Sequence, residues 1–177
     1  MTRVCVFTVG HGTLEAPRLC RLIEEAGVHT IVDVRSIPGS RHNPQFNSEE
    51  MARWLPDCGV RYRWEPRLGG FRKVSPTSPH VALRHPRFRA YADYMDSTDF
   101  RLALDLVLSE ALQQTVAFLC AETLWWRCHR RLIADATVLL RGTEVLHLGH
   151  NGRMEPHRLT DGVRVATGRL LYDVKTE

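Results

Sequence analysis

The sequence predicts an α/β fold, with a mainly parallel sheet between two layers of helices and a small β-hairpin near the C-terminal end. Two observations predict this architecture. Short apolar runs at 4–9, 30–34 and 115–121 have the uninterrupted hydrophobicity of strands that are buried on both faces. Stretches with the helical spacing of apolar residues separate these runs, and alternation of strand and helix is typical of parallel sheets covered by helices.

Each element has a local signal. Strands are predicted at 4–9, 30–34, 60–64, 115–121 and 144–148. Helices are predicted at 13–26, 47–58, 88–95, 99–113 and 128–140. Gly27 and Gly59 suit helix ends, because glycine readily adopts the left-handed conformation found there. Asn47 followed by Glu50 resembles a capping box. Apolar pairs around residues 167–168 predict the hairpin at 163–174, and residues 65–86 are expected to form a long irregular loop.

The composition is that of one domain spanning residues 1–177, with 44% hydrophobic residues and a net charge of +4. No stretch approaches the roughly 20 apolar residues of a membrane span, and no signal peptide precedes the first strand, so we expect a cytoplasmic protein. The five cysteines are an odd number, which favours a reduced compartment over a disulfide framework. The many arginines indicate an anionic partner, either a small molecule or a nucleic acid, although a solvated surface fits them equally well. The oligomeric state stays open.

The segment 119–130 is the densest in chemistry. It follows the central strand, where α/β proteins usually place their sites. Glu122 comes directly after the strand and suits an acid or a base. His129 and Arg130 belong to a cationic cluster at a predicted helix start, which opposes the helix dipole unless an anion binds there. The dipole and these cations would lower the pKa of Cys128 and make it nucleophilic, whereas Cys120 is expected to pack inside the strand.

A second group follows the strand at 30–34. Asp33 lies in an apolar run, and a buried carboxylate is costly unless it is paired or hydrogen-bonded. Arg35 lies on the same strand face, so a structural ion pair and a catalytic Asp33 both fit. The loop beyond carries side chains that recognise phosphate, sugar or base, namely Ser36, Arg41, Asn43, Gln45 and Phe46.

Glycine-rich turns supply further candidates. His11 lies between two glycines after the first strand, where it could contact a ligand, exchange a proton or simply hydrogen-bond within the turn. Gly69 and Gly70 precede two cations, which suits close approach of the backbone to an anion, although a plain flexible turn has the same composition.

A zinc site is an alternative use of the cysteines. It could combine Cys120, Cys128 and His129 with His11 or His147. The seven residues between the cysteines are not a standard zinc spacing, so we predict no metal and no cofactor, with zinc as the weaker alternative. The residues at 33–35 superficially resemble rhodanese domains, but no cysteine with an arginine at the required five-residue gap follows the strand.

Seven motifs in order resemble the family called domain of unknown function 488. They are Thr-Val-Gly-His (8–11), Asp-Val-Arg-Ser (33–36), Arg-x-Asn-Pro-Gln-Phe-Asn (41–47), Leu-Gly-Gly (68–70), Tyr-x-x-Tyr-Met (91–95), Leu-Cys-Ala-Glu (119–122) and Cys-His-Arg (128–130). Residues 145–148 and 157–172 also fit the pattern. The resemblance implies a compact α/β fold and supplies no established reaction, although some members carry the label "DNA repair protein". The family pattern has a proline where this chain has residues 123–126, whose two tryptophans could stack on a base.

We therefore expect an enzyme that acts on a nucleotide or nucleic-acid substrate, a hydrolase of glycosidic or phosphate-linked bonds. Asp33 and Glu122 would form the acid–base pair, with His129 and His11 moving protons. Cys128 as a covalent nucleophile is the variant mechanism. The predicted substrate-binding residues are Arg35, Ser36, Arg41, Asn43, Gln45, Phe46, Gly69, Gly70, Tyr94, Trp125 and Arg130. The alternatives are a non-catalytic nucleic-acid-binding module and a Cys/His metal or thiol redox site.

Overall fold

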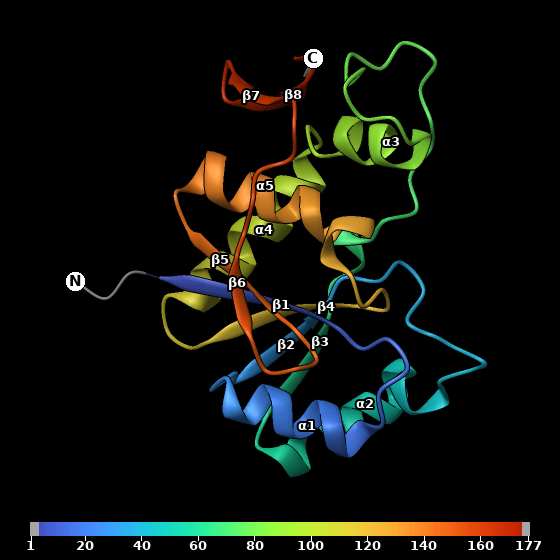
Figure 1. Ribbon diagram of the computed structural model, residues 1–177, viewed down its shortest axis with the longest axis vertical. Helices are drawn as coiled ribbons and strands as arrows, with labels where there is room; N and C mark the ends of the chain where they lie inside the picture. Colours follow the sequence, from blue (N-terminus) through green and yellow to red (C-terminus); the bar gives the residue numbers. More distant parts are fainter. Residues whose placement is uncertain (1–3, 175–177) are drawn as a thin grey trace.

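The computed structural model describes residues 4–174, which contain a six-stranded sheet (Figure 1). The strands are β1 (Cys5–Gly10), β2 (Thr30–Asp33), β3 (Arg61–Trp64), β4 (Val116–Cys120), β5 (Glu144–Leu148) and β6 (Met154–Pro156), in the order β3-β2-β4-β1-β5-β6. Strands β1 to β5 are parallel, which confirms the predicted α/β fold. Strand β6 runs antiparallel along β5 and was not predicted, because its three exposed residues carry no apolar pattern.

Helices cover both faces of this sheet. Figure 1 shows α1 (Ala16–Glu25) and α2 (Ser48–Trp54) on one side, and α3 (Pro86–Tyr94), α4 (Thr98–Ala111) and α5 (Arg130–Arg141) on the other. Each layer buries its own apolar cluster against the strands. Single 3₁₀ turns lie at η1 (Pro44–Phe46), η2 (Pro56–Cys58), η3 (Pro66–Leu68) and η4 (Trp125–Arg127). Within residues 4–174, no helix combines the length and apolar character needed to cross a membrane.

Local sequence explains the buried face of α1 but not the capping of α2. In α1, Leu19, Leu22 and Ile23 are the buried face, at the spacing that predicted the helix. The predicted capping role of Asn47 is wrong. Its side chain caps no helix and instead accepts a hydrogen bond from the backbone N–H of Ser40 at 2.6 Å. Asn47 still occupies the N-cap position of α2, since its carbonyl oxygen accepts from the Met51 N–H, but its side chain closes the loop between β2 and α2.

A separate hairpin lies near the C-terminal end, at the top of Figure 1. Strands β7 (Val163–Ala166) and β8 (Arg169–Tyr172) pair antiparallel, as predicted. Tyr172 is fully buried at the end of β8, and its backbone carbonyl accepts a hydrogen bond from Ala82 at 2.8 Å. The hairpin therefore fastens the end of the irregular segment 65–86 to the rest of the fold.

Two of the cysteines are not reduced, which corrects the expectation drawn from their odd number. Cys20 on α1 and Cys58 in η2 form a disulfide that spans 38 positions of the sequence. Cys5, Cys120 and Cys128 carry free thiols. The sequence did not indicate the disulfide, because two cysteines 38 positions apart give no local signal of their pairing.

Candidate active site

The carboxyl ends of the parallel strands meet at one edge of the sheet, and a cavity of about 600 Å³ opens there. The register aligns Gly10 of β1 with Cys120 of β4, and Asp33 of β2 with Leu119. The loops that leave these strand ends line the cavity. Eight of the predicted site residues lie on its wall, namely His11, Arg35, Ser36, Asn43, Gly70, Glu122, Cys128 and His129.

Hydrogen-bond donors surround the sulfur of Cys128. The backbone N–H of Arg130 and its side-chain Nε–H each donate to Sγ at 3.4 Å. The Cys120 thiol, at the end of β4, lies within 4.8 Å of the same sulfur. Cys128 itself is only 5% exposed, yet it lines the cavity. The sulfur is therefore solvated by protein donors rather than by water.

The imidazole of His129 lies beside this sulfur in a fixed orientation. Its Nε2–H donates to the carbonyl oxygen of Val34 at 2.8 Å, which leaves Nδ1 facing Cys128 Sγ at 3.6 Å. A nucleophile, an adjacent base and a third group that orients the base are the parts of an activated-cysteine site. His129 Nδ1 is placed to hold the proton that Cys128 gives up.

These contacts govern the ionisation of Cys128. Burial by itself would raise the pKa of this thiol. The Cys120 thiol and the positive charges of His129 and Arg130 outweigh burial and hold the pKa of Cys128 well below its ordinary value. The pKa of Cys120 moves the opposite way, well above its ordinary value, because of its interaction with Cys128 and its own burial. Of the two thiols, Cys128 is therefore the one that ionises more readily.

Arg130 is a buried cation without a carboxylate partner. Its side chain is 2% exposed, and within the described part of the chain no carboxylate oxygen lies within 4.0 Å of it. Its Nη2 donates to the carbonyl oxygen of Glu122, and Nη1 donates to Thr8 Oγ1 at 3.4 Å. A buried cation is costly unless an anion compensates it. The Cys128 sulfur lies against this guanidinium and is the group that can supply the compensating negative charge when it ionises.

Two glycines make room for this arrangement. A side chain at Gly10 would collide with the Glu122 carbonyl oxygen and lie 2.8 Å from Arg130 Nη2. A side chain at Gly70 would lie 2.7 Å from Nδ1 of His129. The end of β1 and the Gly69-Gly70 turn can therefore approach Arg130 and His129 closely only because Gly10 and Gly70 carry no Cβ atom.

Asp33 forms a structural ion pair and does not face the cavity. Its Oδ1 accepts from Arg35 Nε at 2.9 Å, and Oδ2 accepts from Arg35 Nη2 at 2.6 Å and from the Tyr62 hydroxyl at 2.7 Å. The carboxylate is fully buried. The acid–base pair expected of Asp33 and Glu122 is thus not the arrangement present, because the Asp33 oxygens are occupied by Arg35 and Tyr62.

His11 is held in the same network as a neutral side chain. Its Nδ1–H donates to the Gly12 carbonyl at 2.8 Å, and its Nε2 accepts from Arg35 Nη1 at 3.2 Å. Burial, together with the nearby Arg35 and Arg130 charges, lowers its pKa to about 4. The ring also stacks on Phe46, with 4.3 Å between centroids. Both ring nitrogens are engaged, so His11 orients Arg35 rather than moving protons.

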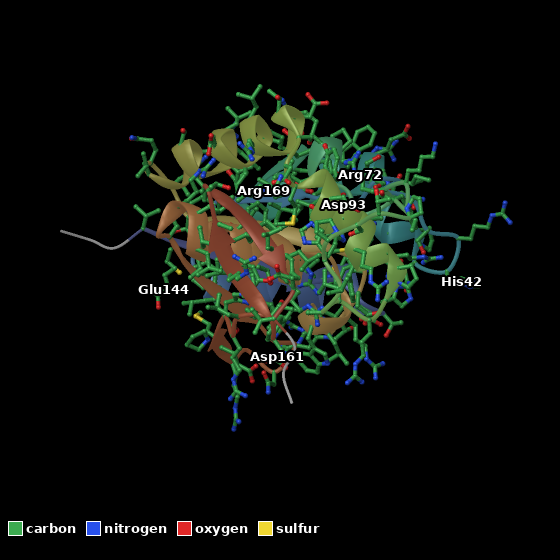
Figure 2. All side chains as sticks on the ribbon, turned by 90° about the horizontal axis from the view of Figure 1, so that it is seen from above. His42, Arg72, Asp93, Glu144, Asp161 and Arg169 are labelled. Carbon is green, nitrogen blue, oxygen red and sulfur yellow. A yellow bond between two sulfur atoms is a disulfide. The ribbon has the colours of Figure 1, made fainter. Side chains whose placement is uncertain are left out.

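The remaining predicted residues lie away from the cavity. Gln45 donates to the Leu14 carbonyl, and Phe46 is fully buried. Arg41 is exposed next to His42, which Figure 2 shows at the outer tip of its loop. Gly69 packs on Ser36. The Tyr94 hydroxyl donates to the Arg67 carbonyl, and its ring lies under the Arg72 guanidinium. Trp125 and Arg130 line a second, smaller cavity of about 320 Å³.

The rim of the main cavity contains residues that sequence reasoning did not select. Arg87 comes from the start of α3 and Arg127 from η4, and both are exposed cations. Ile37, Phe71 and Phe88 supply an apolar part of the wall. Arg127 stood in the cationic cluster noted in the sequence, whereas Arg87 and Phe88 carry no local signal, since their proximity depends on how α3 packs.

The zinc alternative can be weighed against this geometry. Cys120, Cys128 and His129 place their ligand atoms within 4.8 Å of one another, while His11 and His147 are engaged elsewhere. A metal ion on the Cys128 sulfur would lie beside the buried Arg130 guanidinium, and repulsion between the two cations disfavours it.

The fold and the site together define an α/β protein with a cysteine–histidine pair at the carboxyl edge of its sheet. The chain belongs to the family described as Domain of unknown function DUF488, whose model matches residues 15–137, more than half of the chain. The match includes Cys128 and His129 but not β1 or the segment after residue 137. No curated protein and no solved structure matches the chain.

Proposed function

We propose that this protein is an enzyme that uses the Cys128 thiolate as a nucleophile on a phosphate-bearing substrate, a nucleotide or a nucleic acid, and hydrolyses a phosphate-linked bond. The observation that carries the proposal is the buried sulfur surrounded by Arg130, His129 and Cys120. A structural cysteine needs no such cationic surrounding, whereas a reactive thiolate does.

The geometry supports a two-step reaction. The Cys128 sulfur attacks phosphorus, a sulfur–phosphorus bond forms, and the bond to the leaving oxygen breaks. The leaving oxygen takes the proton on His129 Nδ1, which lies 3.6 Å from the sulfur. Water then attacks the phosphocysteine, Nδ1 takes the proton of the water, and the thiolate is released. Glu122, exposed on the cavity wall, lies where it can orient this water.

The lining of the cavity supports a nucleotide-like substrate. Arg87 and Arg127 suit recognition of phosphate. Ile37, Phe71 and Phe88 offer an apolar surface for a base, and Asn43 contributes an amide. A volume of about 600 Å³ is in the range of small-molecule sites.

The test is turnover by purified full-length protein of p-nitrophenyl phosphate and a panel of nucleoside phosphates. We expect Cys128→Ser to abolish phosphate release and acid quenching of the wild type to trap phosphate on Cys128, detected by peptide mass spectrometry. Cys5→Ser is the matched control, since Cys5 lies at the start of β1 and not on the cavity. Phosphate release that survives Cys128→Ser would refute the nucleophile.

Oligonucleotide binding by the same Cys128→Ser variant separates a non-catalytic nucleic-acid-binding module from the enzyme. A module would bind oligonucleotides with steep salt dependence and would tolerate Cys128→Ser without loss. Alkylation of Cys128 at low pH together with an absence of turnover on every phosphate tested would favour the thiol redox alternative.

A further inference from the structure

Behind Arg130, four buried side chains form an unbroken hydrogen-bonded chain that does not reach the main cavity. We call it the relay, and it consists of Thr8, His147, His157 and Asp135. Thr8 Oγ1 lies 2.7 Å from His147 Nδ1, and His147 Nε2 lies 2.9 Å from His157 Nδ1. His157 Nε2 lies 2.9 Å from Asp135 Oδ1. The relay thus joins β1, β5, the segment after β6 and α5.

Each end of the relay faces a charged group whose hydrogen-bonding role is fixed. The Asp135 carboxylate can only accept, so His157 Nε2 carries a proton. At the other end of the relay, the Arg130 guanidinium can only donate, so Thr8 Oγ1 accepts from it. Burial and the neighbouring His157 and Arg130 lower the pKa of His147 to about 3, which keeps it neutral.

Thr8 joins the relay to Arg130. Its hydroxyl oxygen lies 2.7 Å from His147 Nδ1 and accepts from Arg130 Nη1, 3.4 Å away. At the far end, Asp135 is fixed by the Tyr172 hydroxyl at 3.0 Å and the Thr160 backbone N–H at 3.0 Å. The indole of Trp125 stacks on the His147 ring, with 4.1 Å between centroids and 4° between planes. The relay therefore cannot rotate without breaking several contacts.

We propose that the relay is a positioning device that holds the Arg130 guanidinium against the Cys128 sulfur. The proposal rests on the proposed function, because it assigns the relay a role in activating that thiolate. The relay residues do not line the main cavity, and hydrogen bonds connect them to the Cys128 sulfur through Arg130. They are positioning residues, and their loss changes the reactivity of the sulfur rather than removing a reacting group.

The groups that face the sulfur from each packed element must be considered in any pH measurement. They are Cys120 from β4, Tyr91 from α3, His129 and Arg130 at the start of α5, and His147 from β5. The relay substitution used below leaves every one of them in place.

The experiment measures how the rate of Cys128 alkylation by iodoacetamide varies with pH in full-length protein, with the modified peptide quantified by mass spectrometry. Thr8→Val removes the hydroxyl and keeps the shape. We expect it to raise the midpoint of the profile and to slow alkylation at about pH 6 by roughly threefold to tenfold, the effect of one net hydrogen bond. Thr8→Ser should restore the wild-type profile.

Thr137→Val is the matched control, because Thr137 is also a buried threonine but bonds only the Ile133 carbonyl within α5. His157→Gln provides the same test two links away if Thr8→Val does not fold. If the alkylation midpoint of the wild type is low and neither Thr8→Val nor His157→Gln changes it, the role of the relay is refuted and the proposed function remains intact. A wild-type midpoint at the ordinary thiol value, about 8.5, refutes the proposed function and the relay with it.

Discussion

Replacing Arg130 by methionine is the most direct perturbation of the site. Methionine retains much of the apolar stem of the side chain and removes the positive charge and all of its donors. Cys128 Sγ then loses the Nε–H at 3.4 Å but keeps the backbone N–H of residue 130 and the contact with His129. The thiolate is therefore less stabilised while the thiol is almost unaffected, so the pKa of Cys128 must rise.

The size of the rise follows from the contact that is lost. A hydrogen bond from a charged donor is worth about 1.5–3 kcal/mol. Because about 1.4 kcal/mol corresponds to one pKa unit, we expect the pKa of Cys128 to rise by about one to two units. At any pH well below the wild-type midpoint, the thiolate fraction falls by about tenfold to a hundredfold.

The assay is the pH profile of Cys128 alkylation, with thermal unfolding recorded in parallel to show that the variant is folded. Arg127→Met is the matched control, because Arg127 lines the same cavity but is not a donor to the sulfur. A folded Arg130→Met protein with the wild-type midpoint would show that the guanidinium does not activate the cysteine, and our account of the site would fail.

Three further predictions concern single features of the structure. The free energy of unfolding should fall by about 3 kcal/mol as pH falls from about 6.5 to about 4, because the unfolded chain protonates His11 before the folded protein does. Urea unfolding at both pH values should show that His11→Gln loses less stability in acid than the wild type. Cys58→Ser should lower the free energy of unfolding, measured in urea, by about 4 kcal/mol, the loop-closure value for a separation of 38 residues. If reductant does not change the unfolding midpoint of the wild type, the disulfide is contradicted. Gly70→Ala should displace His129 and slow the alkylation of Cys128, whereas Gly39→Ala should not, because its added carbon lies no nearer than 3.9 Å to another residue. Equal alkylation rates in the two variants would contradict the close approach of Gly70 to His129.

The fold and the grouping of Cys128 with His129 and Arg130 could be predicted from the sequence for a common reason. Buried parallel strands appear as local apolar runs, and Cys128, His129 and Arg130 are consecutive, so one segment of chain already places thiol, imidazole and guanidinium together. The role of Asp33 was not accessible, because an ion pair with Arg35 and a catalytic carboxylate use the same residues at the same spacing. The structure decides between them through the Tyr62 hydroxyl and Arg35, which occupy both oxygens of Asp33.

Contacts between distant segments could not be predicted. Thr8 and His147 are separated by 139 positions and meet only because β1 and β5 are neighbours in register. The same register brings His147 under Trp125, a ring that the sequence suggested for stacking on a base. Cys120 was expected to be a packing residue, and its relation to Cys128 depends on where η4 returns the chain to the end of β4.

The buried guanidinium of Arg130 affects which chemical groups the Cys128 sulfur can carry without a loss of protein stability. An uncharged adduct on Cys128, such as an acyl or alkyl group, would quench the anion and leave Arg130 uncompensated inside the protein, with a cost to folding. A transferred phosphoryl group brings its own negative charge and keeps the interior electrically balanced. Electrostatics thus favours an anionic group over a neutral one on the Cys128 sulfur. A neutral label on Sγ should lower the melting temperature of the protein more than an anionic label of similar size.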